Sequence, residues 1–247
     1  MKAYDPDLAF LASCTDEELD PLIDVLLDKD HKGRISSELE LEPRYKCYYP
    51  LHSMYADLIA HELRKYGGNT IANIFRGGEG VAYRELLCDV CDEMKVNYNP
   101  RSSIERIEDG LLSKVLEKVW EEMDPDQRRK VLESIGCNPH AVGGATSSVM
   151  IALFRQGGFQ SYKLVLIVVN AVWRAIFGKG LSLVANKTIC QVLSVATGPI
   201  GWAVSAVWTA LDIGSPALRV TIPGAIYVAA LRRMKNEQAA LAALQSA

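Results

Sequence analysis

The chain has 247 residues, of which 49% are hydrophobic and 23% are charged, a composition that excludes a disordered, collagen-like or disulfide-scaffold protein. Residues 1–137 hold 28 of the 30 acidic and 18 of the 27 basic residues, a net charge of −10, whereas residues 138–247 carry +7. The acidic part would repel nucleic acid and the basic part lacks a dense Lys/Arg patch, so we expect no nucleic-acid partner.

Residues 1–137 carry repeated helix signals. Thr15-Asp-Glu-Glu18 has the pattern of a capping box and opens a helix with a leucine stripe. Pro43 and Pro50 bound a segment that we predict to be a loop rich in tyrosine (Tyr45, Tyr48, Tyr49). A helix should follow from about Leu51 and end at Gly67-Gly68, since glycine is the usual helix C-cap.

The same signals continue to the end of this part. We predict helices over residues 81–95, from a second capping box at Ser102-Ser-Ile-Glu105, and after Asp124-Pro125, with a stop at Gly136. Residues 1–137 are therefore expected to form one domain, an acidic helical bundle.

From residue 138 the helices lose their polar face, so residues 138–247 are expected to form an apolar, basic module rich in glycine and alanine. Leu164–Trp173 is β-branched enough for a strand, but its flanks favour a helix. Residues 219–234 should form a helix interrupted by Pro223, with a frayed tail from Lys235. The predicted fold class is all-α: the bundle packed with this module.

Several motifs carry a resemblance to a known family. They are Phe10-Leu11 with Cys14–Leu19, Gly67–Asn73, Tyr83-Arg84 with Leu87–Val90, Trp120–Asp124, Arg219–Pro223 and Leu231–Met234. They resemble the uncharacterised bacterial YaaW-like family, which is grouped with the ubiquinol–cytochrome c assembly chaperones. The resemblance implies a helical fold and a chaperone-like ancestry, and it implies no catalytic residues.

Cys88-Asp-Val-Cys91 is the one CxxC motif, and His52 and His61 on the preceding predicted helix could complete a zinc site. The alternative, which we favour, is that cysteines three residues apart on one helix face are buried as small apolar side chains. His61-Glu62 does not begin an HExxH signature, because residue 65 is lysine. We therefore predict no metal and no cofactor.

Two further patterns have structural interpretations. Arg76-Gly-Gly-Glu-Gly80 could receive an anion at a helix start, but a turn between helices is favoured because no strand precedes it. The acids of residues 105–122 alternate with bases and are typical of a solvated helix face. They are Glu105, Glu108, Asp109, Glu117, Glu121 and Glu122. We predict that the protein is not an enzyme.

Thr188–Leu211 has no charged residue, but Gly198-Pro199 divides it into two pieces, each too short to span a bilayer of about 30 Å. Bases and interfacial aromatics lie nearby: Trp173, Lys179, Lys187, Trp202 and Trp208. We expect the C-terminal module to contact a membrane or an apolar partner through these residues. Gly198 and Pro199 would act as the hinge, and the N-terminal bundle would keep the module soluble.

Two alternatives remain open. The protein could be a soluble helical chaperone or adaptor for a protein client, or a metal-binding enzyme that uses Cys88 and Cys91. Six cysteines without framework spacing, and an N-terminus without signal-peptide features, predict a cytoplasmic location. The membrane hypothesis adds a peripheral position at the inner membrane.

Overall fold

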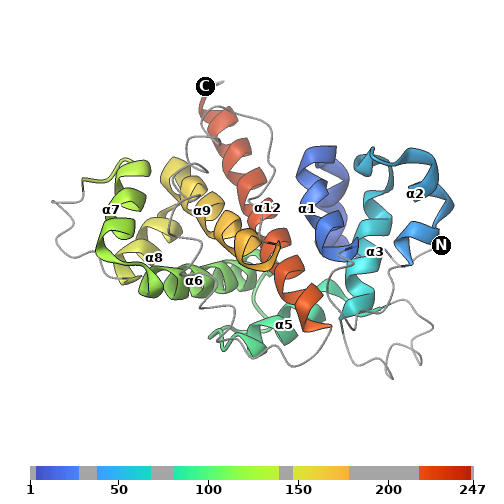
Figure 1. Ribbon diagram of the computed structural model, residues 1–247, viewed down its shortest axis with the longest axis horizontal. Coiled ribbons are helices and arrows are strands. Elements are labelled where there is room, and N and C mark those ends of the chain that lie inside the picture. Colours follow the sequence, from blue (N-terminus) through green and yellow to red (C-terminus); the bar gives the residue numbers. More distant parts are fainter. Residues whose placement is uncertain (1–3, 28–37, 68–79, 139–146, 178–216, 246–247) are drawn as a thin grey trace. The chain divides into compact units, whose positions relative to one another are not determined.

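The computed structural model describes residues 4–27, 38–67, 80–138, 147–177 and 217–245. These residues form helices joined by turns, with no strand among them, so the predicted all-α class is confirmed (Figure 1). In chain order the elements are η1 Pro6–Ser13, α1 Asp16–Leu27, η2 Leu39–Leu41, α2 Pro43–Tyr48, η3 His52–Tyr55, α3 Ala56–Tyr66, α5 Tyr83–Glu93, α6 Ile104–Glu122, α7 Pro125–Ser134, α8 Ser147–Gln156, α9 Gly158–Phe177 and α12 Leu218–Gln245.

The chain divides into two compact units. Unit 1 comprises residues 1–107 and 213–227, and unit 2 comprises residues 108–212 and 228–247. This division differs from the change of composition at residue 137, because α7 joins the helices that follow it: Lys163 of α9 donates to the Ser134 carbonyl at the end of α7, at 2.8 Å. Helices α6 and α12 each supply residues to both units.

Unit 1 is built around the leucine stripe of α1. The capping box that opens α1 is confirmed: the Glu18 amide donates to the Thr15 hydroxyl at 3.3 Å, and the Thr15 amide donates to the Glu18 carboxylate at 2.9 Å. Leu19, Leu22 and Leu26 are fully buried. The Tyr227 hydroxyl of α12 donates to the Glu18 carbonyl at 2.8 Å, and this bond ties the distant C-terminal segment to α1.

The backbone at residue 80 passes close to the end of α3, and this approach requires glycine. The Val81 amide donates to the Arg64 carbonyl at 3.2 Å, and Arg64 Nε donates to the Val81 carbonyl at 2.7 Å. A Cβ at Gly80 would lie 2.6 Å from the carbonyl carbon and oxygen of Arg64, and φ there is +72°. Only glycine combines this backbone angle with so close an approach.

Unit 2 contains the apolar helix that the sequence predicts at Leu164–Trp173. Helix α9 runs from Gly158 to Phe177, and every residue from Leu164 to Asn170 is buried. Helix α7 begins as predicted, with Asp124 as its N-cap and Pro125 in its first turn, and the predicted stop at Gly136 has φ +81°. Gly157 and Gly158 both have positive φ and separate α8 from α9.

Three elements differ from the sequence expectation. The predicted tyrosine-rich loop is largely helix α2, and η1 was not predicted. Helix α12 is longer than expected, since it continues through Pro223 and includes the residues after Lys235. Pro223 lies close to the helix start, where its missing N–H leaves one intrahelical bond unmade and does not end the helix.

Candidate interaction surface

An exposed group of apolar side chains lies on unit 1. It comprises Leu41, Tyr48, Tyr49, Leu51 and Met54, called the aromatic surface below, with exposed fractions between 37% and 69%. These are five of the eight large hydrophobic residues that are exposed in the described part of the chain. Single exposed apolar residues are ordinary, whereas five of them within residues 41–54 are a candidate binding surface.

The aromatic surface is built on a short helix that buries none of its own residues. Pro43 lies in the first turn of α2, where its fixed φ favours a helix start. The helix packs beside η2 and η3, and the Tyr45 ring lies 5.4 Å from the Tyr49 ring and 5.5 Å from the Tyr55 ring, between centroids. Tyr45 and Tyr49 therefore pack against each other at the surface, and Tyr45 also meets the edge of the buried Tyr55 ring.

His52 fixes the base of the surface. Its side chain is 2% exposed, and Nε2 lies 2.7 Å from the Asp20 carboxylate of α1. Nδ1 is hydrogen-bonded to the Tyr55 hydroxyl. Burial, reinforced by Tyr45 and Tyr49, raises the pKa of Tyr55 well above its usual range, so this hydroxyl stays protonated.

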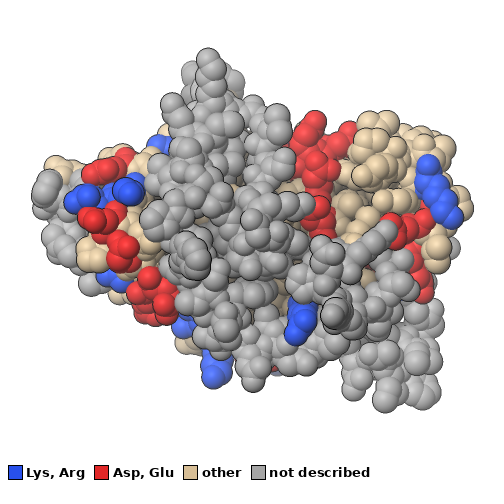
Figure 2. Space-filling view, in the orientation of Figure 1, with Lys and Arg blue, Asp and Glu red and all other residues tan. Residues whose placement is uncertain are grey.

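Charged side chains hold the backbone beneath the surface. The Ser53 amide donates to the Asp16 carboxylate at 2.7 Å, and this backbone bond is the main cause that lowers the pKa of Asp16. Arg44 donates to the Met54 carbonyl at 2.6 Å and to the Asp57 carboxylate at 2.8 Å. The apolar side chains are thus presented on a preformed backbone. Figure 2 shows acidic side chains gathered over α1, an uncharged surface between α1 and α2, and basic side chains at the outer edge over α2.

The candidate zinc ligands do not assemble. His52 is engaged by Asp20 and Tyr55, His61 is buried in α3, and Cys91 is fully buried in α5 while Cys88 is partly exposed. Within the described ranges, no three histidine, cysteine or acidic side chains form a group that could hold a metal ion.

The residues predicted to contact a membrane are mostly outside the described part of the chain. Lys179, Lys187, Trp202, Trp208 and the predicted hinge Gly198-Pro199 all lie in residues 178–216. Trp173 is described: it is 1% exposed, in the core of unit 2. None of the helices that the structure describes is long and apolar enough to cross a membrane.

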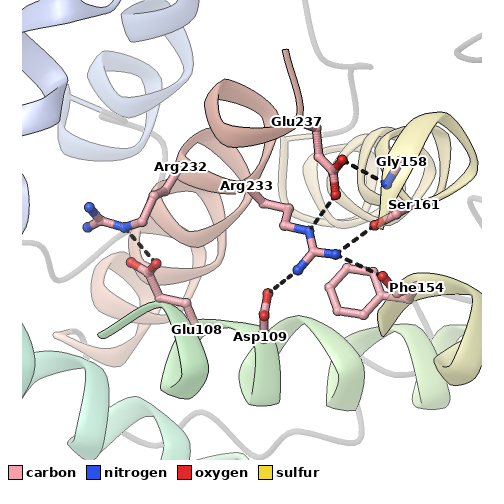
Figure 3. A network of polar contacts seen from close by, with 8 residues as sticks. All are labelled: Glu108, Asp109, Phe154, Gly158, Ser161, Arg232, Arg233 and Glu237. Carbon is pink, nitrogen blue, oxygen red and sulfur yellow. Dashed lines mark hydrogen bonds and ion pairs between the residues drawn. The ribbon is translucent and has the colours of Figure 1, made fainter. Parts of the chain in front are cut away.

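A second polar cluster lies in unit 2, where two adjacent arginines of α12 meet two adjacent acids of α6 (Figure 3). Arg232 Nε lies 2.7 Å from the Glu108 carboxylate, and both side chains are buried. Arg233 pairs with Asp109 at 2.9 Å. The prediction that these acids lie on a solvated face is wrong for Glu108, because its basic partner is 124 residues away and cannot be identified from local spacing.

Arg233 also joins α8 and α9 to the cluster. Its guanidinium donates to the Phe154 carbonyl at 2.9 Å and to the Ser161 hydroxyl at 3.0 Å, and lies over the Phe154 ring. Glu237, paired with Arg233 at 3.2 Å, accepts from the Gly158 amide at the start of α9 at 2.7 Å. Burial raises the pKa of Asp109, and Arg233 opposes this rise. Since these groups satisfy one another, we interpret the cluster as structural.

Comparison with known families defines the class of protein. The family model described as "Ubiquinol-cytochrome C chaperone" matches residues 52–229, and that of a "Domain of unknown function (DUF3944)" matches residues 3–35. The first match covers well over half of the chain, begins with η3 and ends within α12. No solved structure matches the chain.

Individual relatives extend the match over almost the whole chain. A UPF0174 protein of Helicobacter pylori strain J99 is 44% identical over 239 residues, covering 96% of this chain and 94% of the relative. The UPF0174 protein YaaW of Escherichia coli K12 is 30% identical over 237 residues, covering 93% and 94%. The chain belongs to this YaaW-like UPF0174 family of chaperone-type proteins, which confirms the resemblance seen in its motifs.

Proposed function

We propose that the protein is a non-catalytic, chaperone-like binding protein that holds apolar segments of an incompletely folded client on the aromatic surface. The observation that carries the proposal is the surface itself: Leu41, Tyr48, Tyr49, Leu51 and Met54 are exposed on a backbone fixed by ion pairs and hydrogen bonds. The description of the matching family as a chaperone supports the same function.

The polar groups beneath the surface favour binding over catalysis. Asp20, His52 and Tyr55 form a chain of hydrogen-bonded groups of the kind that acid–base enzymes use. His52 and Tyr55 are 2% and 0% exposed, however, so a substrate on the surface would not reach either proton-carrying group. Their role in this proposal is to hold η3 in place.

The proposal can be tested by suppression of aggregation of heat-unfolded citrate synthase, measured by light scattering. The wild-type chain should suppress scattering, and a Tyr49→Ser/Leu51→Ser/Met54→Ser variant should lose this activity. A Val149→Ser/Phe159→Ser variant is the matched control, because it removes exposed apolar side chains from α8 and α9. Equal suppression by both variants, with circular dichroism showing both folded, would refute a role for the aromatic surface.

A second candidate function is conditional binding to a membrane surface through the C-terminal module, favoured by the charge-free run at residues 188–211. In this hypothesis Trp173, Trp202, Trp208, Lys179 and Lys187 contact lipid, and Gly198-Pro199 forms the bend. Trp173 could take part only after α9 leaves its packing, because it is now buried. Both candidates place the protein in the cytoplasm, and the second adds the inner membrane surface.

Flotation of the full-length chain with neutral and anionic vesicles, at neutral and mildly acidic pH, tests this second function. Floating with anionic vesicles, lost in a Trp202→Asp variant that still suppresses aggregation, would support it. Absence of the protein from the floating fraction under every condition would refute it.

A further inference from the structure

The charges around the aromatic surface are predominantly acidic. Asp16 holds the Ser53 amide and Asp20 holds His52, while Asp57 pairs with Arg44. Glu40 and Glu42 flank Leu41 in the sequence, and Glu40 is close enough to Tyr45 to help raise its pKa, after burial and Tyr49. Arg44 and Lys46 are the bases of α2.

These described groups that contact or flank the surface sum to five acids and two bases, a formal charge of −3. Arg44 and Asp57 neutralise each other at 2.8 Å, so the net charge comes from Asp16, Asp20, Glu40 and Glu42 against Lys46. A like-charged ligand would therefore be repelled by the acids of α1 and of residues 40 and 42, and an oppositely charged ligand would be attracted. An anionic lipid headgroup is the wrong occupant by this criterion, since anionic leaflets attract basic segments.

We propose, building on the function above, that the partner of the aromatic surface is an amphipathic helix of a client protein that carries lysine or arginine beside its apolar face. Leu41, Tyr48, Tyr49, Leu51 and Met54 receive the apolar face, as a helix laid on an apolar surface requires. The net negative charge of the surrounding groups attracts the basic residues.

Complementary charges at the edge of such a contact add selectivity more than affinity. Each exposed ion pair contributes little by itself, so a few pairs together should give roughly a tenfold preference for a basic over an acidic helix at low salt. The preference should shrink as salt rises, because exposed charges are screened beyond about 10 Å at 0.1 M ionic strength.

Fluorescence anisotropy with two synthetic peptides tests the inference on the full-length chain. Both peptides are about 18 residues long, or five turns of helix, and share one leucine face. One has lysines on the polar face and the other has glutamates. The lysine peptide should bind roughly tenfold more tightly at about 50 mM salt, with most of the difference lost at about 300 mM.

Charge variants make the test specific to this surface. Glu40→Gln/Glu42→Gln should weaken binding of the lysine peptide and spare the glutamate peptide, whereas Lys46→Glu should strengthen binding of the lysine peptide. Glu121→Gln/Glu122→Gln, which removes two exposed acids from α6, is the control and should change neither. Equal affinity for the two peptides would overturn the inference, as would a preference that only the α6 control alters.

The outcomes separate this inference from the function on which it rests. Suppression of aggregation that depends on Tyr49, Leu51 and Met54, without a charge preference, would leave the binding function standing and remove the basic partner. Binding to anionic vesicles that the Tyr49→Ser/Leu51→Ser/Met54→Ser variant abolishes would show that the occupant is a lipid surface. Failure of both peptides to bind, together with failure to suppress aggregation, would reject the proposed function itself.

Discussion

Unit 1 presents the aromatic surface to solvent, and unit 2 holds a largely buried cluster of charged side chains on α6 and α12. In unit 1 the aromatic surface stays in solvent because hydrogen bonds and ion pairs hold its backbone beside α1 and α3. In unit 2 the Glu108 carboxylate is buried against Arg232. The Arg233 guanidinium is largely buried because it pairs with Asp109 and donates to Phe154 and Ser161. The aromatic surface can therefore be altered at little cost in stability, whereas the charged cluster cannot.

Breaking the buried pair of unit 2 should have the largest effect. Replacing Glu108 with Gln leaves the Arg232 charge buried beside a neutral amide, and we expect the free energy of unfolding to fall by about 3 kcal/mol. Urea denaturation followed by circular dichroism measures the change. Glu108→Leu/Arg232→Met should recover most of the loss, because the pair as a whole adds little net stability. A double variant less stable than Glu108→Gln would contradict this account.

Gly80 in unit 1 and Gly136 in unit 2 allow the backbones of the two units to be compared. Both have positive φ, but a Cβ at Gly80 would lie 2.6 Å from Arg64 backbone atoms whereas a Cβ at Gly136 meets nothing within 4 Å. We expect Gly80→Ala to cost about 3 kcal/mol and Gly136→Ala about 1 kcal/mol. Thermal unfolding of both variants checks the order, and equal losses would show that the close approach at Gly80 adds nothing.

Asp16 and Asp109 should respond to pH with opposite signs. The pKa of Asp16 is lowered by the Ser53 amide, so its stabilising contribution is present above 3.8 and is lost as pH falls through the folded-state value. The pKa of Asp109 is raised by burial, so its ionisation costs stability as pH rises from 3.8 through its folded-state value. NMR titration of the two carboxyl carbons should place their midpoints on opposite sides of 3.8.

The smallest change in stability per replaced residue is expected at the aromatic surface. Tyr49→Ser/Leu51→Ser/Met54→Ser should change the free energy of unfolding by about 0.5 kcal/mol per residue or less, because these side chains are already half in water. Urea denaturation measures this, with His52→Ala as the contrast, since that variant removes a buried side chain bonded to Asp20 and Tyr55. A loss in the triple variant comparable to that in His52→Ala would show that the surface is part of the core.

The sequence predicts the helices whose signals are local, and misses what depends on contacts across the chain. The capping box at Thr15, the N-cap at Asp124 and the stop at Gly136 lie within a few residues of the atoms they bond, so the sequence alone predicts them. Helix α2 has Pro43 in its first turn, and Tyr45, Tyr48 and Tyr49 follow at the helical spacing i, i+3 and i+4, so its sequence does carry a helix signal. The prediction of a loop followed Pro43 and Pro50 instead, and the helix buries none of its residues.

The candidate site was missed for a related reason. The prediction of binding residues followed the long apolar run, where composition is conspicuous, whereas exposure of Tyr49 or Leu51 depends on what the rest of unit 1 covers. The pairing of Glu108 with Arg232 is similarly invisible in local spacing, because acid and base lie on α6 and α12. The charge difference between residues 1–137 and 138–247 is visible in the sequence, but the two compact units of the structure have other boundaries.

The adjacent arginines of α12 help to specify a single register of this helix along α6. The buried alanines of α12 at residues 225, 229 and 230 are too alike to distinguish one sliding position of a helix from the next. Arg232 and Arg233 must reach Glu108 and Asp109 together, and displacing α12 by a single residue would leave a buried charge unmatched. We infer that the cluster determines the register of α12 along α6, while the burial of apolar side chains provides most of the stability of their packing.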